Sequence, residues 1–431
     1  MRAVVFAALI LLGCPLAAQV VTDANRHMGV ATCSASNCHG KAAKSTTARV
    51  WLTEYRIWRS QDYHARAFKT LASPESRLIA QKLGLKNAQS DPLCLDCHAS
   101  NVSQSKRGPK FQLTDGVGCE SCHGGAERWL DSHDNEGTSQ ADNIRNGMYP
   151  AADPTARADL CLTCHMGTAN KMATHRIMGA GHPRLYFEVE NFTINQPPHY
   201  EIDADYRQRK GDVPRVNLWL IGQFETAKRY LALLQSRQLA AGGLFPELAF
   251  YDCQGCHHPV ETNPKAGDLR WTLARRAQGL VAGQPRLQDQ HFQMLGAVAE
   301  VLAPGESPIL SGKVSALLRA GQSNRDQITR AAADLGAWLE ARRQSWTKRV
   351  ITNEQARAIR RRLVRDAGTG RIQDYAIAEL GLISVQTLTI YLGEENKLQG
   401  ELDRLYQGLG GSASFRPGTY AAAARGVEGR F

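Results

Sequence analysis

Five pairs of cysteines in this 431-residue chain are each followed directly by a histidine, and no other feature constrains the fold as strongly. Two residues separate the cysteines in four of the motifs, whereas Ser34 to Asn37 separate them in the first. With 11 Cys and 13 His in the chain, chance alone would give about 0.01 strict Cys-x-x-Cys-His strings. The repetition therefore has a chemical cause. The motifs are Cys33/Cys38-His39, Cys94/Cys97-His98, Cys119/Cys122-His123, Cys161/Cys164-His165 and Cys253/Cys256-His257.

This spacing is the attachment signature of c-type haem. Two thiols must reach the two vinyl groups of one macrocycle, while the imidazole of the next residue reaches the iron. We therefore predict five covalently bound haems, the first through a variant motif with a four-residue gap. Paired cysteines also bind zinc, but four-thiolate zinc sites do not require a histidine after every second cysteine. A disulfide framework is typical of much smaller secreted chains.

The N-terminus predicts export. Residues 1–18 have the form of a signal peptide, because Arg2 precedes an apolar run and Leu16-Ala17-Ala18 offers a small-residue cleavage site. The run is too short to span a bilayer, so we expect no transmembrane helix in the mature chain and a periplasmic location. A cut before Cys14, the one cysteine outside the motifs, would instead leave a lipid-anchored protein.

The formal charge of +11 overstates how basic the loaded protein would be. Each haem carries two propionates, so five haems would add about ten negative charges. The basic excess is concentrated between Arg342 and Arg365, where Glu354 is the one acidic residue. Three interpretations stay open for this segment: a solvated helix face, neutralisation of haem propionates, or docking of an acidic redox partner. Nucleic acid is not an expected partner of an exported haem protein.

Periodicity predicts a mainly α fold with little sheet, in which residues 19–262 form a multihaem cytochrome c domain and residues 263–431 a helical C-terminal domain. Short helices are expected around the attachment sites, and a long helix over 213–240. Residues 185–192 alternate like a strand. The Gly- and Ala-rich end from Gly408 is expected to be loosely held. The apolar stripes are Leu220, Phe224, Ala227, Leu231 and Leu234, then Leu335, Trp338 and Leu339, then Ile377, Leu380, Val385, Leu388 and Leu392.

Eight further histidines could supply second axial ligands. His64 lies in an aromatic-rich and helical context, and glycines between His175 and His182 would let the backbone approach a flat cofactor. Methionine is the other common axial ligand, and Met166 or Met178 could serve. His258 adjoins the last motif, while His199 and His291 look more like ordinary hydrogen-bonded histidines. We therefore predict the distal ligands to be His64, His133, His175, His182 and His27.

Two segments resemble a known family. Trp58 to Ala65, which contains His64, and the string Gly-Val-Gly-Cys-Glu-Ser-Cys-His-Gly at 116–124 resemble the multihaem cytochrome family that includes the tetrahaem electron acceptor of hydroxylamine oxidoreductase. The resemblance covers roughly residues 24–262. It implies closely spaced haems, with the motif histidines as proximal ligands and His64 as a distal one. The fifth motif, the enlarged first loop and the long cysteine-free tail depart from the tetrahaem pattern.

The favoured function is electron transfer, with partners among periplasmic redox proteins or membrane-bound quinone and cytochrome systems and with no catalytic residue. The alternative is an oxidoreductase in which one open-faced haem acts on a small nitrogen or sulfur compound. The lysine-for-histidine motif of ammonia-forming nitrite reductases is absent from the sequence. A third possibility is a subunit of a larger respiratory complex, docked through the helical tail.

Overall fold

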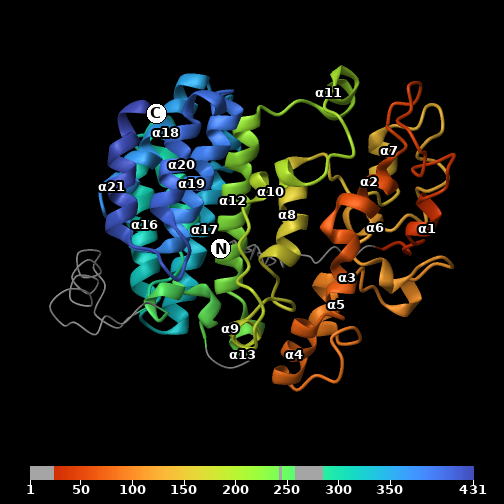
Figure 1. The fold of residues 1–431 in the computed structure, drawn as a ribbon, viewed down its shortest axis with the longest axis horizontal. Helices are drawn as coiled ribbons and strands as arrows, with labels where there is room; N and C mark the ends of the chain where they lie inside the picture. The colour runs from red at the N-terminus through yellow and green to blue at the C-terminus, as the bar shows by residue number, and fades with distance from the viewer. Residues whose placement is uncertain (1–23, 242–244, 258–284) are drawn as a thin grey trace, which may run out of the picture.

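The computed structural model describes residues 24–241, 245–257 and 285–431. Within these ranges the chain forms helices, and its strand-like pairing is limited to the isolated bridges His27–Arg107 and Tyr251–Leu287. This confirms the predicted mainly α class. Figure 1 shows the N-terminal motifs on one side of the molecule and the C-terminal helices on the other, with α12 (Arg215–Leu234) between them. The predicted signal peptide, Cys14 and His258 lie outside the described residues.

Short helices hold most of the motif residues. Asp91 and Asp153 start the helices of the second and fourth motifs in the same way, because each side chain accepts a backbone N–H and a proline follows at the first helical position. The second, third and fourth motif histidines are the last residues of their helices. The elements are α1 (Val30–Cys33), α2 (Glu54–Gln61), η1 (Tyr63–Arg66), α3 (Ala67–Thr70), α4 (Pro74–Leu83), α5 (Pro92–His98), η2 (Gln104–Lys106), η3 (Leu113–Asp115), α6 (Cys119–His123), α7 (Gln140–Arg145), α8 (Pro154–His165), α9 (His175–Gly179), α10 (Val189–Asn195) and α11 (Ala204–Lys210).

This half of the molecule has little side-chain core. The clusters that its buried apolar residues form are small, one of Leu71, Ala80, Ala88, Leu95 and Ala99, the other of Ala158, Leu162 and Val189. A segment this long normally buries a much larger apolar area. A large apolar cofactor would supply that missing core.

The C-terminal helices share one continuous core, which also includes α12. Helix α12 packs against α8 as well as α15, α17 and α19, and most of its residues are buried. The predicted stripes are confirmed: Leu220, Phe224 and Leu234 are fully buried, as are Leu335 and Leu388. The remaining elements are α13 (Arg237–Ala241), η4 (Leu248–Phe250), η5 (Cys253–Gly255), α15 (Gln290–Leu302), α16 (Ser307–Ala320), α17 (Arg325–Thr347), α18 (Asn353–Gly368), α19 (Tyr375–Tyr391), α20 (Glu395–Leu409), α21 (Pro417–Val427) and η6 (Glu428–Arg430).

Two local predictions are wrong. The chain end is not loose, because α21 packs against α18 and α20, and Tyr420, Ala424 and Phe431 are buried. The small side chains of the segment that was expected to be loose are what permit this close packing. Residues 185–192 form no strand within the described chain, because the Glu188 side chain accepts the backbone N–H of Asn191 and thereby begins α10.

The basic segment 342–365 is largely tied into the bundle by ion pairs. Arg342 bonds to Glu306 at 2.7 Å, and Arg357 and Arg360 both bond to Glu394, at 2.8 and 2.6 Å. Arg360 is 2% exposed. The segment is therefore mostly structural rather than a freely solvated face. Among the described residues, none of the helices is both long enough and apolar enough to cross a bilayer.

Candidate functional site

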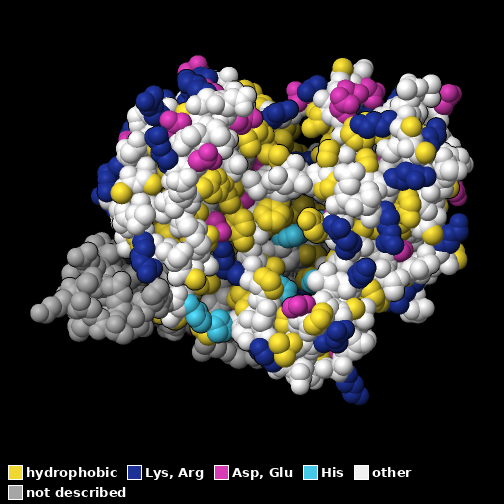
Figure 2. Space-filling model, viewed as in Figure 1, with side chains coloured by type: hydrophobic (Ala, Val, Ile, Leu, Met, Phe, Trp, Pro, Cys, Tyr) yellow, Lys and Arg dark blue, Asp and Glu magenta, His cyan; other side chains and the backbone are white. Residues whose placement is uncertain are grey.

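Each motif histidine faces a second histidine from a distant part of the chain. The ring centroids lie 6.0–6.4 Å apart in all five cases. Figure 2 shows histidine side chains within a hollow of the molecular surface, among hydrophobic side chains. The pairs are His39–His133, His98–His182, His123–His199, His165–His64 and His257–His175. We number the sites 1 to 5 in the order of their motifs along the chain.

The spacing of these rings fits one metal ion between two imidazoles. A first-row metal ion binds an imidazole nitrogen at about 2.0–2.1 Å, and that nitrogen lies roughly 1.15 Å from the centre of its ring. Two imidazoles on opposite sides of one metal ion therefore have centroids about 6.3 Å apart. The observed separations match this value. The residues present thus fit haem iron with two axial histidines.

Hydrogen bonds at Nδ1 orient many of these rings. Among the motif histidines, His39 contacts Glu54 Oε2 at 3.0 Å and His98 contacts the Ala67 carbonyl at 3.1 Å. Fixing Nδ1 leaves Nε2 as the nitrogen that can bind a metal. The facing histidines show the same arrangement: His64 with Asp62 Oδ1 at 2.9 Å, His133 with the Leu130 carbonyl at 2.6 Å, and His182 with the Pro183 carbonyl at 2.8 Å.

Burial and charge set the protonation of these rings differently from site to site. Burial lowers the pKa of both His123 and His165 to about 4, so each is the neutral imidazole that ligates metals. The carboxylates of Glu54 and Asp62 instead raise the pKa of His39 and His64. A carboxylate on Nδ1 increases the basicity of a ligating imidazole.

The motifs pack against one another in pairs. At sites 1 and 3 the side chains of Cys33 and Cys119 form a hydrogen bond, and the buried Glu120 carboxylate accepts the backbone N–H groups of Met28 and Gly29, both at 2.7 Å. At sites 2 and 4 the Cys97 and Cys164 side chains form a hydrogen bond. The ten described cysteines are all free thiols, so each is available for thioether formation.

The second cysteines of the first and last motifs, Cys38 and Cys256, lie outside the short helices at their sites and so depart from the arrangement of the other three motifs. In the other three motifs both cysteines lie within one helix, three residues apart, so that the two thiols share a face. Helix α1 instead ends at Cys33, and η5 ends at Gly255, which leaves Cys38 and Cys256 outside these elements. Short helices are thus present at these two attachment sites as expected, but each ends before the second cysteine.

The reason for the departure differs between the two residues. Five positions along a continuous α-helix amount to more than one turn, so Cys38 would lie on a different face from Cys33. The chain therefore leaves the helix, and Cys38 Sγ lies 3.7 Å from Asn37 Oδ1. Cys256 takes φ −121°, far from the helical value, and is exposed. Thioether formation at both residues stays a prediction.

Helix α9 connects sites 2 and 5. His175 is its first residue and faces the site 5 histidine, while His182 follows its end and faces the site 2 histidine. The backbone N–H of His175 donates to Glu247 at 2.9 Å, and Gly181 takes φ +121° beside Ile79. That conformation strains any residue with a Cβ, so the glycine is required for the chain to return toward site 2.

Four of the predicted distal histidines lie opposite a motif histidine: His64, His133, His175 and His182. The structure places His27 elsewhere. It is 5% exposed, and its backbone bonds to Lys106 and Gly108 in the short bridge beside Arg107. All five motif histidines face a histidine other than His27, so the structure does not place His27 at any of these pairs.

Sequence reasoning missed His199, which faces His123 at site 3. It follows Pro197-Pro198 in a segment between α10 and α11, and it hydrogen-bonds the Pro197 backbone. No local pattern marks this residue, because its position is set entirely by how distant segments pack. Each of the five motif histidines needs a facing ligand, and the sequence has eight further histidines, so His199 could have been kept as a candidate.

The donor set differs from a zinc site. In the portion of the chain that the structure describes, no three or more His, Cys, Asp or Glu side chains are grouped so as to bind one metal ion. A structural zinc site needs four such ligands around the ion. Opposed pairs of imidazoles suit a metal whose other four positions are filled by a macrocycle.

One comparison with known proteins found a match. Residues 31–124, which include the first three motifs, match the family described as cytochrome c554 and c-prime, a multihaem c-type cytochrome family. Curated proteins and solved structures gave no match. The match confirms the family resemblance over that stretch. Over residues 31–124 the chain is therefore similar to cytochrome c554 and c-prime, and this likeness supports a c-type cytochrome that holds haem covalently and carries electrons.

Proposed function

We propose that the protein binds five haems, one at each opposed histidine pair, and transfers electrons between redox partners of the periplasm or the membrane. The observation that carries this proposal is the common 6.0–6.4 Å separation of the ring pairs. Each haem supplies one-electron chemistry at its iron. With imidazole on both faces, no position would remain for a substrate.

The chain's own residues have separate roles in this proposal. The ten motif cysteines anchor the macrocycles, and the five motif histidines occupy one face of each. The other faces take His133, His182, His199, His64 and His175 at sites 1 to 5, so His199 replaces the predicted His27. Glu54 and Asp62 orient the rings at sites 1 and 4 and favour low reduction potentials there.

The electron paramagnetic resonance spectrum of the purified, air-oxidised protein tests this function. The pyridine assay gives the haem content of the same sample. We expect five haems per chain and only low-spin signals. A high-spin signal that shifts on adding nitrite, hydroxylamine or nitric oxide would contradict the proposal. That result would favour the oxidoreductase with an open-faced haem.

The periplasmic location is part of the same proposal and is supported by the signal peptide predicted at residues 1–18. Covalent haem attachment in bacteria takes place on the outer side of the inner membrane. Mass spectrometry of the mature N-terminus would distinguish cleavage near Ala18 from lipidation at Cys14.

A further inference from the structure

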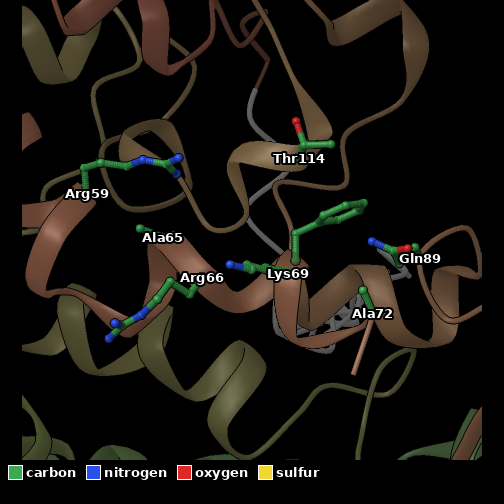
Figure 3. A pocket seen from close by; sticks show the side chains of 8 residues that line it. Arg59, Ala65, Arg66, Lys69, Ala72, Gln89 and Thr114 are labelled. Carbon is green, nitrogen blue, oxygen red and sulfur yellow. The ribbon is translucent and has the colours of Figure 1, made fainter. Parts of the chain in front are cut away.

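A surface pocket of about 480 Å³ lies beside sites 2 and 4. Residues of α2, η1 and α3 form one side of it. The other side is formed by Gln89, which precedes α5, and by Thr114 of η3 (Figure 3). Its lining is Arg59, Ala65, Arg66, Phe68, Lys69, Ala72, Gln89 and Thr114.

The lining is cationic and holds no carboxylate. Arg59 and Lys69 extend toward one another across Ala65, whereas Arg66 extends away from them (Figure 3). Like charges that face each other repel, so this arrangement is favourable only when a counter-charge is present. Gln89 and Thr114 can add uncharged donors.

These cations differ from the arginines of the bundle. Within the described residues, Arg59, Arg66 and Lys69 form no ion pair, whereas Arg342, Arg357, Arg360 and Arg362 each bond to a carboxylate. Two acidic residues, Asp62 and Asp115, lie near this lining. Asp62 bonds to His64, and burial raises the pKa of Asp115 while Arg59 opposes that shift. Three cationic side chains thus line the pocket while Asp115 is the carboxyl that meets one of them, Arg59, so further counter-charge would come from outside this part of the fold.

An exposed aromatic side chain extends the same surface. Tyr63 is 81% exposed, and the Arg66 guanidinium lies 4.6 Å from the centre of its ring. Tyrosine and arginine are enriched at protein interfaces, where they often dominate binding. A small dissolved anion would gain no contact from such a ring.

The surface also adjoins two candidate metal centres. His64 of site 4 lies between Tyr63 and Ala65 in the chain, and the Ala67 carbonyl accepts the Nδ1 hydrogen bond of His98 at site 2. A protein bound here would contact backbone that leads directly to both histidines. The pocket thus lies next to the histidines of two candidate metal centres, so a protein bound there would be close to both.

We propose that Arg59, Tyr63, Arg66 and Lys69 form the docking face for a redox protein that presents acidic side chains. The inference rests on the proposed electron-transfer function, because it names the class of partner. It moves the docking role from the arginine-rich segment 342–365, whose charges are largely paired within the bundle, to α2, η1 and α3.

A deca-glutamate peptide serves as the probe of this face. Its affinity for the air-oxidised holoprotein is measured by calorimetry at low and at physiological salt. For the double variant Arg59→Glu/Lys69→Glu we expect binding about tenfold weaker, since each exposed charge contact is worth a few-fold. The matched control Arg361→Glu/Lys397→Glu changes the same net charge at exposed positions of the bundle and should bind within about twofold of wild type.

A second variant guards against loss of fold in the first. Tyr63→Ala removes an exposed ring and no charge, and we expect it to weaken peptide binding while haem content stays unchanged. Equal weakening by both double variants would mean that only net charge matters, which overturns the docking face. Displacement of the peptide by equimolar inorganic phosphate would do so as well, since the pocket would then be a small-anion site.

A further outcome concerns haem propionates. If Arg59→Gln/Lys69→Gln shifts midpoint potentials but leaves peptide binding unchanged, these side chains neutralise propionates and the docking face is wrong. Peptide binding tests the docking face and does not depend on electron transfer. The low-spin signals test the proposed function and do not depend on the peptide. Failure of this inference is therefore distinguishable from failure of the proposed function.

Discussion

At the scale of single residues, the orientation of the opposed histidine rings depends on the group that hydrogen-bonds to Nδ1. Glu54, Asp62 and several backbone carbonyls fix that nitrogen and so aim the other one. The His199 ring is likewise held by a hydrogen bond to the Pro197 backbone, whereas the His27 backbone forms a bridge to Arg107. Orientation, rather than the mere presence of a histidine, separates the proposed ligands from the rest.

Replacing His199 tests its assignment directly. His199→Ala leaves site 3 with one axial histidine, so we expect one haem in five to become high-spin in the paramagnetic resonance spectrum. The matched control is His27→Gln, which should keep all haems low-spin. An unchanged spectrum for His199→Ala together with a high-spin signal for His27→Gln would reverse the assignment.

At the scale of elements, a buried polar chain joins α10, α12 and α15. Glu188 accepts a hydrogen bond from Gln223 at 2.9 Å, and the Gln223 side-chain oxygen contacts His291 Nδ1 at 2.8 Å. Phe187, the residue before Glu188, stacks on the His165 ring of site 4 at 4.2 Å. The buried carboxyl thus lies one residue from the support of a proposed iron ligand.

The stability of the protein should depend on pH through Glu188. Burial raises the pKa of Glu188 to about 7 from its ordinary value of 4.5. The folded state therefore holds a proton that the unfolded state has lost, and stability falls as pH rises between these values. Relative to Glu188→Gln, the wild-type free energy of unfolding should drop by about 3 kcal/mol between pH 4.5 and pH 7. Denaturant unfolding at several pH values measures it, and parallel curves for the two proteins would contradict it.

Local pattern was enough to predict some of these elements. The stripe of α12 predicted a helix over 213–240, and the structure has α12 and α13 there, separated at Gln235 and Ser236. The Cys and His motifs predicted the attachment residues because that chemistry is confined to adjacent positions. The partner of His123 was not predictable, since tertiary structure, rather than neighbours in sequence, brings the segment between α10 and α11 to that ring.

At the scale of the whole molecule, the two halves are joined through α12. One core cluster contains α12 and the helices after residue 285, while α12 also packs against α8, which ends at His165 of site 4. The helical tail is therefore continuous with the structure that supports a candidate metal centre. A docking role for the tail, if present, would be additional to this structural one.

Deleting residues 285–431 should abolish soluble, haem-loaded protein. The deletion exposes Trp219, Leu220, Phe224, Leu231 and Leu234, each worth about 1.5–3 kcal/mol when buried. Haem content and yield of the soluble fraction measure the effect. A soluble truncated protein that keeps every haem would show that the tail is a separable module.

The opposed histidine pairs also have a consequence for how the protein matures. The stretches of sequence between paired histidines overlap, from His39–His133 through to His175–His257. Dividing the chain at any point between His39 and His257 would therefore separate the two members of at least one pair. The chain is synthesised from its N-terminus. At sites 1 to 3 the facing histidine is therefore made after the motif, whereas at sites 4 and 5 it is made before the motif. The pair at site 5 would thus be the last to be completed.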